Sequence, residues 1–116
     1  GCDRNCGFCT IPSFKGPHRS RPMTHICREV EELVRKGKKE LILVDQDTTQ
    51  YRDGQYSLAD LLRSLDAIEG DFWIRVLYTH PTISIRLYWR VSPPVTRSSL
   101  ILTFRFNTPP IQSCAR

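Results

Sequence analysis

Two stretches of the chain carry apolar residues at the spacing of an amphipathic helix. In residues 24–36 the apolar positions are Ile26, Val30, Leu33 and Val34, which fall on one helical face. In residues 57–68 they are Leu58, Leu61, Leu62, Leu65 and Ile68. Ser57 is a favoured N-cap residue, and Gly37 and Gly70 are natural C-terminal stops. We therefore expect two helices.

A short apolar run follows each of these helices and predicts a strand. Residues 40–45 contain the run Leu41–Val44, which is typical of a fully buried strand, and residues 72–78 form the second. Because a helix connects them, the two strands should pair in parallel. We expect four side chains to be buried: Leu41, Leu43, Ile74 and Val76. The fold class is α/β, with successive βαβ units in a barrel or an open sheet whose first strand precedes the chain.

In such folds the chemistry gathers where the strands end. Here those positions are Asp45, Gln46 and Asp47 after the first strand, and Thr79 and His80 after the second. Two other segments read as loops. Residues 1–22 are rich in turn residues, and residues 46–56 are polar.

Composition changes near the middle of the chain. The 116 residues form one small domain or part of a larger one, and the net charge of +5 permits an anionic partner without requiring one. All 12 acidic residues lie at or before Asp71, and periodicity is lost after Pro81. We expect an ordered unit at 1–81 and an irregular tail at 82–116.

The chain shows no signal for secretion or for a membrane. It contains no apolar run of the roughly 20 residues that span a bilayer, and its start lacks the order of a signal peptide. We expect a cytoplasmic protein without a membrane partner. The missing initiator Met indicates a start inside a longer chain.

Three cysteines lie close together as Cys2-x3-Cys6-x2-Cys9. An odd, tightly spaced trio without secretion signals favours a metal over disulfides. Zinc would need a fourth ligand, and neither His18 nor Cys27 has the paired spacing. Three thiolates on a [4Fe–4S] cluster would leave one iron open, which a reactive cluster needs.

The motif with Phe8 before the last cysteine resembles the signature of radical S-adenosylmethionine (SAM) enzymes. Residues 1–16 and 19–22 resemble the methylthiotransferase branch of that superfamily. Within the branch, Ile11-Pro12-Ser13 and Gln46-Asp47-Thr48-Thr49-x-Tyr51 resemble the enzymes that modify a small-subunit ribosomal protein (RimO-like). The tRNA-modifying members (MiaB-like), which more often carry an Asn-containing second motif, are the alternative.

The resemblance, which covers residues 1 to about 81, implies a βαβ fragment of a partial TIM barrel. Cys2, Cys6 and Cys9 would hold a [4Fe–4S] cluster whose open iron binds SAM, and one electron would release a 5′-deoxyadenosyl radical. The substrate would be an aspartate of a small-subunit ribosomal protein, methylthiolated on its β-carbon. A flavodoxin or ferredoxin would supply electrons, and the fragment alone should be inactive.

The resemblance also implies roles around SAM, each with a plainer alternative. The backbone around Phe8 would pack on adenine; the plainer alternative is that Phe8 is a core anchor, and the two roles are compatible. Gln46 and Asp47 would contact SAM or the reaction centre, or cap their loop. A basic loop would neutralise a carboxylate of SAM or of the substrate, or is a solvated, salt-bridging loop; it consists of Lys15, His18, Arg19 and Arg21.

Three residues outside the motifs need an assignment. Cys27 is expected to be a small buried apolar residue rather than a ligand. His25, near a helix start, should lie on the surface. His80, at a strand end, either faces the site or plays no part in it.

The sequence of residues 82–116 suggests translation in a shifted reading frame. Family members carry a segment like Pro-Tyr-Leu-Asp-Ile-Pro-Phe-Gln-His, and codons compatible with residues 99–108 encode it in another frame. We therefore expect the residues from about 82 onward to be an out-of-frame translation, in which Cys114 has no function. The in-frame alternative predicts a strand at 100–106.

Two functions from other classes compete with the enzyme. A zinc-stabilised nucleic-acid-binding module would need a fourth ligand and a basic face. A ferredoxin-like electron carrier would need a fourth cluster cysteine. Neither feature is evident in the sequence.

Overall fold

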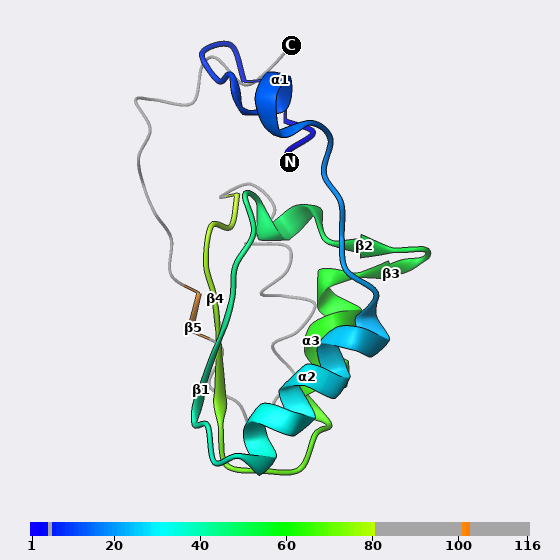
Figure 1. Ribbon diagram of the computed structural model, residues 1–116, viewed down its shortest axis with the longest axis vertical. Helices are drawn as coiled ribbons and strands as arrows, with labels where there is room; N and C mark the ends of the chain where they lie inside the picture. The colour runs from blue at the N-terminus through cyan, green and yellow to red at the C-terminus, as the bar shows by residue number, and fades with distance from the viewer. Residues whose placement is uncertain (5, 81–100, 103–116) are drawn as a thin grey trace.

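A parallel sheet carries two helices on one of its faces (Figure 1). The computed structural model describes residues 1–4, 6–80 and 101–102. The sheet has the order β1-β4-β5, and its strands are β1 (Glu40–Leu43), β4 (Trp73–Val76) and β5 (Ile101–Leu102). The helices packed on it are α2 (Met23–Arg35) and α3 (Leu58–Asp66). No helix in the described part of the chain is long and apolar enough to span a membrane.

The parallel pairing of β1 and β4 confirms the βαβ prediction. Leu41 lies opposite Ile74, and Leu43 lies opposite Val76. Helix α3 lies in the connection between these strands, as a parallel crossover requires. Strand β5 also runs parallel to β4, with Ile101 opposite Arg75.

Both helices end and begin as the sequence predicts, to within two residues. Helix α2 closes in a Schellman turn, in which Gly37 has φ 80° and its N–H donates to the Val34 carbonyl at 2.8 Å. The N–H of Lys38 donates to the Leu33 carbonyl at 3.0 Å. At the start of α3, Asp60 Oδ2 accepts from the backbone N–H and the hydroxyl of Ser57, at 2.8 and 2.7 Å.

The core lies between the helices and the sheet. Its largest fully buried side chains are Leu61, Leu65, Ile74 and Val76. Leu41 is buried as predicted, but Leu43 is only half-buried, which corrects that prediction. Burying these side chains on one face contributes most of the stabilisation of this layer.

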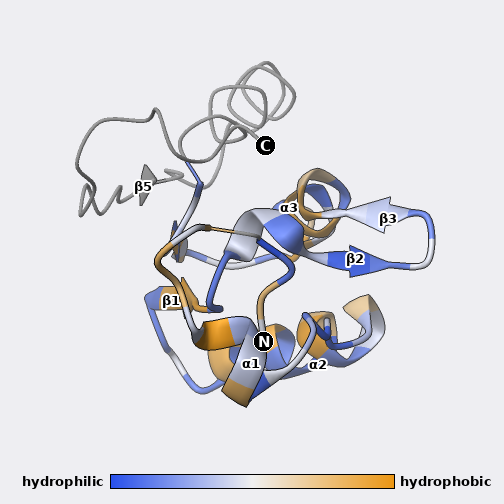
Figure 2. Cartoon of the chain, turned by 90° about the horizontal axis from the view of Figure 1, so that it is seen from above, coloured by the Kyte–Doolittle hydropathy of each residue, from blue (hydrophilic) through white to orange (hydrophobic). Residues whose placement is uncertain are grey.

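The prediction of a fully buried first strand is wrong for this structure. Ile42 and Val44 are 50% and 62% exposed, and Trp73 on β4 is 44% exposed. Successive side chains of a strand point to opposite faces, and α2 and α3 cover the same face. Figure 2 shows β1 in the hydrophobic colour, with α2 and α3 on the same side of it.

Three short elements interrupt segments that the sequence predicts to be loops. They are helix α1 (Ile11–Lys15), the 3-10 turn η1 (Thr48–Gln50) and a hairpin of β2 (Arg52–Asp53) and β3 (Tyr56–Ser57). The hairpin turns through Gly54, whose φ of 58° suits the first central position of a two-residue turn.

The tail lies outside the described residues except at β5. Ile101–Leu102 falls within the stretch 100–106 for which the in-frame alternative predicts a strand. The boundary at residue 81 and the shifted reading frame stay predictions, which the DNA sequence around codon 82 would test.

Candidate cofactor-binding site

The segment that carries the three motif cysteines, residues 2–9 (the cysteine segment), begins at a buried cysteine. Cys2 is 8% exposed, whereas Cys6 and Cys9 are half-buried, and none of the three is disulfide-bonded. The Cys2 N–H donates to the Gly16 carbonyl at 3.2 Å, and the Cys9 N–H donates to the Cys6 carbonyl at 3.0 Å. These bonds close residues 2–16 into a loop with an internal turn between its second and third cysteines.

Residues 45–50 form a polar turn after β1 (the polar turn). It lies at the carboxyl end of the sheet, where the sequence predicts the chemistry to be. Asp47 is 6% exposed and caps η1: its Oδ1 accepts the Thr49 N–H at 3.0 Å and the Thr49 hydroxyl. Thr48 Oγ1 donates to the Leu77 carbonyl at 2.8 Å. The turn is therefore bound to the end of β4 as well as to β1.

A partly buried polar network joins this turn to the cysteine segment. Arg4 Nε lies 2.8 Å from Asp47 Oδ2, and Arg4 Nη2 donates to Thr49 Oγ1 at 3.3 Å. Gln50 Nε2 donates to Asp47 Oδ2 at 3.3 Å and to Cys2 Sγ at 3.7 Å. The two motifs that carry the sequence resemblance are thus physically connected.

Asp47 is committed to this network. Its two carboxylate oxygens accept four hydrogen bonds, which occupy about the four lone-pair positions that a carboxylate offers. This arrangement favours the loop-capping alternative for Asp47. Contact of Asp47 with SAM stays a prediction.

The donor set fits a thiolate-bound cluster in residue type, but its side chains are not gathered. Within residues 1–4, 6–80 and 101–102, no group of three or more His, Cys, Asp or Glu side chains is placed to hold a metal ion. Cys2 Sγ nevertheless accepts two N–H groups, from Arg4 at 3.4 Å and from Gln50 at 3.7 Å. Such bonds are typical around sulfurs that carry negative charge on a metal.

The other predicted SAM residues are exposed. Phe8 is 69% exposed, so the core-anchor alternative is wrong within the described structure. Gln46 is also exposed, and its backbone N–H donates to Asp45 Oδ1 at 2.7 Å. Both side chains are therefore accessible to a ligand.

The predicted basic loop divides into exposed and buried members. Lys15 and Arg19 are exposed, and Arg21 forms an exposed ion pair with Glu29 at 2.7 Å. The Arg21 carbonyl accepts the Tyr51 hydroxyl at 3.1 Å. The salt-bridging alternative is therefore confirmed for Arg21.

His18 belongs to the buried side of this loop. Its side chain is 6% exposed, and Nε2 lies 2.9 Å from Ser20 Oγ. Nδ1 lies 3.3 Å from Asp45 Oδ2 but without hydrogen-bond geometry. His18 thus connects the loop to the end of β1, and its backbone N–H donates to Asp3 Oδ1 at 2.9 Å.

The remaining candidates lie apart from the network. Cys27 is half-buried against the core; burial, and then the nearby Glu31 carboxylate, raise the pKa of its thiol, as expected of an apolar role. His25 is exposed, as predicted. His80 is half-buried, and its Nδ1 has no hydrogen-bond partner among the described residues.

Sequence reasoning missed Arg4 and Gln50, which carry the network. Neither has a spacing signal, because the Arg4–Asp47 and Gln50–Cys2 contacts join positions 43 and 48 residues apart. An Arg between two cluster cysteines and a Gln in the polar turn were the available hints.

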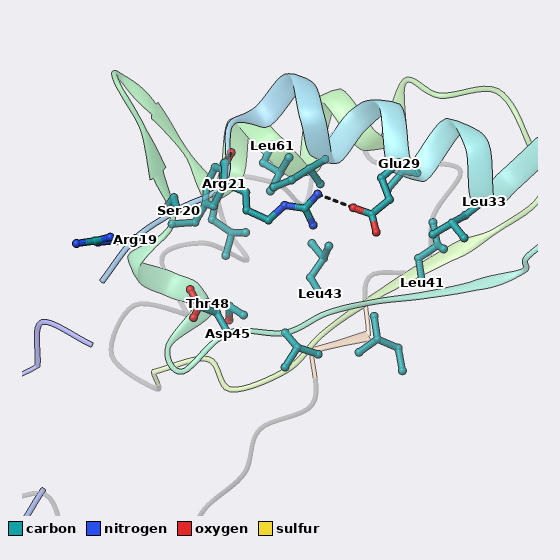
Figure 3. A pocket seen from close by; sticks show the side chains of 16 residues that line it. Arg19, Ser20, Arg21, Glu29, Leu33, Leu41, Leu43, Asp45, Thr48 and Leu61 are labelled. Atoms are coloured by element: carbon teal, nitrogen blue, oxygen red, sulfur yellow. Dashed lines mark hydrogen bonds and ion pairs between the residues drawn. The ribbon is translucent and has the colours of Figure 1, made fainter. Parts of the chain in front are cut away.

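A cavity of about 380 Å³ lies between α2 and β1, away from the cysteines (Figure 3). Its labelled apolar lining residues are Leu33, Leu41, Leu43 and Leu61, and the Arg21–Glu29 ion pair crosses its rim. Asp45 and Thr48 lie at its end near the polar turn. None of the described cysteines lines it, whereas Arg19 and Arg21 of the predicted basic loop and Thr48 of the polar turn do.

Known proteins resemble this chain across the same motifs. The model of the Radical SAM superfamily matches residues 1–91, a range that continues past residue 81. The ribosomal protein uS12 methylthiotransferase RimO of Thermotoga petrophila is 60% identical over 84 residues, which cover 70% of this chain and 20% of the relative.

Other relatives carry the same name. The protein of Moorella thermoacetica is 52% identical over 85 residues, covering 71% of this chain and 20% of the relative. The protein of Akkermansia muciniphila is 45% identical over 98 residues, covering 70% and 22%. The chain therefore spans about a fifth of the length of the curated relatives it matches.

Proposed function

The chain belongs to the radical SAM superfamily, and we propose that it is part of the catalytic core of a methylthiotransferase acting on a small-subunit ribosomal protein. The observation that carries the proposal is the 60% identity to a uS12 methylthiotransferase across a segment that includes 70% of the chain. The target would be an aspartate, modified on its β-carbon. The enzyme would work in the cytoplasm with a flavodoxin or ferredoxin as electron donor.

In this proposal Cys2, Cys6 and Cys9 hold a [4Fe–4S] cluster. When bound, the cluster and SAM together supply a one-electron route to an unactivated C–H bond, which general-base chemistry does not reach. The chain's own residues position this chemistry. Asp47 accepts from Arg4, and this pair holds the cysteine segment against the end of β1.

SAM would lie beside the exposed residues of the site. Phe8 offers an aromatic side chain next to the third cysteine, and Gln46 offers an amide at the end of β1. Asp47, which follows Gln46 in the chain and is buried, orders the turn through Thr49. Phe8 would contact SAM and help to keep water from the reaction centre.

Anaerobic reconstitution of the full chain with iron and sulfide tests the cofactor. We expect a [4Fe–4S] absorption spectrum that changes when SAM is added. Ala substitution of Cys2, Cys6 or Cys9 should abolish iron uptake, whereas the matched control Cys27→Ala should retain it. Stoichiometric zinc without iron uptake would refute the proposal in favour of the zinc-stabilised nucleic-acid module.

The substrate is tested separately, with the full-length product of the gene. Incubation with SAM and either ribosomal protein uS12 or tRNA should add a methylthio group to the protein, detected by mass spectrometry of its peptides. Modification of tRNA alone would identify the MiaB-like alternative. A cluster that transfers electrons but modifies neither substrate would favour the electron-carrier alternative.

A further inference from the structure

The Gln50 side chain contacts the cysteine segment at two points. Its Oε1 accepts the Asp3 N–H at 3.0 Å, and its Nε2 lies 3.7 Å from Cys2 Sγ. The same Nε2 donates to Asp47 Oδ2 at 3.3 Å. One amide therefore connects the first cysteine, the residue after it and the buried carboxylate of the polar turn.

The orientation of this amide follows from its partners. A backbone N–H can only donate, so Oε1 must face Asp3. An ionised carboxylate can only accept, so Nε2 must face Asp47. The second hydrogen of Nε2 then points to Cys2 Sγ. A flipped amide would place two donors together at Asp3 and two acceptors together at Asp47.

The sulfur that receives this donor is enclosed. Cys2 is 8% exposed, and its Sγ also accepts the Arg4 N–H at 3.4 Å. A buried sulfur with negative charge is stabilised by the N–H groups aimed at it, because little water reaches it. Hydrogen bonds to the sulfurs are among the features that set the reduction potential of an iron–sulfur cluster.

We propose that Gln50 is a positioning residue that fixes the first cysteine of the cluster motif and raises the reduction potential of the bound cluster through its N–H···S bond. The effect on potential rests on the proposed function, since it requires a cluster on Cys2. The positioning of Asp3 and Cys2 by Gln50 does not rest on the proposed function, because it requires no cluster. Gln50 acts through these residues and contacts neither SAM nor substrate in this proposal.

Two substitutions separate the two contacts of the amide. Gln50→Glu keeps an oxygen for the Asp3 N–H but replaces the donor that faces Cys2 Sγ and Asp47. Gln50→Leu removes both contacts. Gln55→Glu introduces the same charge at an exposed position in the turn between β2 and β3 and serves as the matched control.

Amide hydrogen exchange of the metal-free full chain tests the positioning. We expect the Asp3 amide to exchange at least tenfold faster in Gln50→Leu, and near the wild-type rate in Gln50→Glu. The Leu77 amide, which donates to Leu43 at 3.0 Å between the strands, reports whether the fold is intact. An unchanged Asp3 amide in Gln50→Leu, with Leu77 still protected, would overturn the positioning role.

Redox titration of the reconstituted chain, followed by electron paramagnetic resonance, tests the bond to sulfur. Gln50→Leu should shift the one-electron reduction equilibrium about tenfold towards the oxidised cluster, which is about 59 mV. Gln50→Glu should shift it further because it adds negative charge, and Gln55→Glu should match the wild type. Equal potentials in all four proteins would overturn the effect on the cluster.

The two failures are distinguishable. A wild-type chain that takes up no cluster would refute the proposed function, while the exchange of the Asp3 amide would still decide whether Gln50 holds the segment. A wild-type chain that takes up a cluster with a potential insensitive to Gln50 would refute this inference and leave the proposed function intact.

Discussion

Each end of the β1–β4 strand pair carries an ion pair between an aspartate and a basic side chain. The two pairs have similar distances but differ in how exposed they are to solvent. At the carboxyl end, Arg4 Nε lies 2.8 Å from Asp47 Oδ2; at the amino end, Lys39 Nζ lies 2.7 Å from Asp71 Oδ2. The Asp47 side chain is 8% exposed, whereas that of Asp71 is 94% exposed. Burial, rather than ion-pair distance, therefore indicates which pair the fold depends on.

Removing each aspartate should give the largest contrast. Asp47→Ala leaves Arg4, the buried donors of Thr49 and the half-buried amide of Gln50 without their acceptor, so we expect a loss of about 2 to 3 kcal/mol in the free energy of unfolding. Asp71→Ala is the matched control and should cause no measurable loss. Urea unfolding at pH 7 compares the two variants. Equal losses would show that burial does not distinguish the pairs.

A smaller effect should follow from loosening the polar turn from the end of β4. Thr48 is buried, and its hydroxyl donates to the Leu77 carbonyl at 2.8 Å and to the Tyr78 carbonyl at 3.3 Å. Thr48→Val keeps the shape but leaves these carbonyls without that donor, which should cost about 1 to 2 kcal/mol by urea unfolding. Thr79→Val is the control, because its Oγ1 has no partner among the described residues.

The contrast between the apolar layer and the polar turn also explains what the sequence could predict. Helices α2 and α3 were predictable because periodic apolar positions and their capping residues specify them locally. The exposure of Ile42 and Val44 was not, because the run Leu41–Val44 has the same composition whether one or both faces of the strand are covered. The hairpin had a local signal, Gly54 at the first central position of its two-residue turn, within a segment that otherwise reads as polar loop.

The site divides in the same way. The cysteine spacing and the polar turn after β1 could be identified as separate motifs, since each is local in sequence. The contacts of Arg4 with Asp47 and of Gln50 with Cys2 could not, because polar side chains far apart in sequence leave no period. The structure adds this connection between the two motifs.

Changing the shape of the half-buried cation, Arg4, should have a still smaller effect. Arg4→Lys keeps the charge near Asp47 but loses the planar fork that reaches both Asp47 and Thr49 Oγ1. We expect a loss of about 1 kcal/mol, smaller than that of Asp47→Ala. Lys39→Arg at the exposed pair is the control and should be neutral. A loss in Arg4→Lys as large as in Asp47→Ala would assign the whole effect to the guanidinium.

The exposed Lys39–Asp71 pair should change the pKa of Asp71 even though we expect its removal to cause no measurable change in the free energy of unfolding. The Lys39 ammonium, by its hydrogen bond first and its charge second, lowers the pKa of the Asp71 carboxyl. A carboxyl whose pKa is lower in the folded state contributes stability that is present above its unfolded pKa, about 3.9, and is lost as the pH falls through the folded value. Between pH 7 and 5 this contribution is constant, so the free energy of unfolding of Asp71→Asn should change with pH in parallel with that of the wild type.

Nuclear magnetic resonance of the Asp71 carboxyl should show its pKa rising towards the ordinary range in Lys39→Ala. Added salt should produce the same rise in the wild type, because the pair is open to solvent. A pKa that salt does not move would mean that the pair is shielded from water, and the difference between the two ends of the strand pair would disappear.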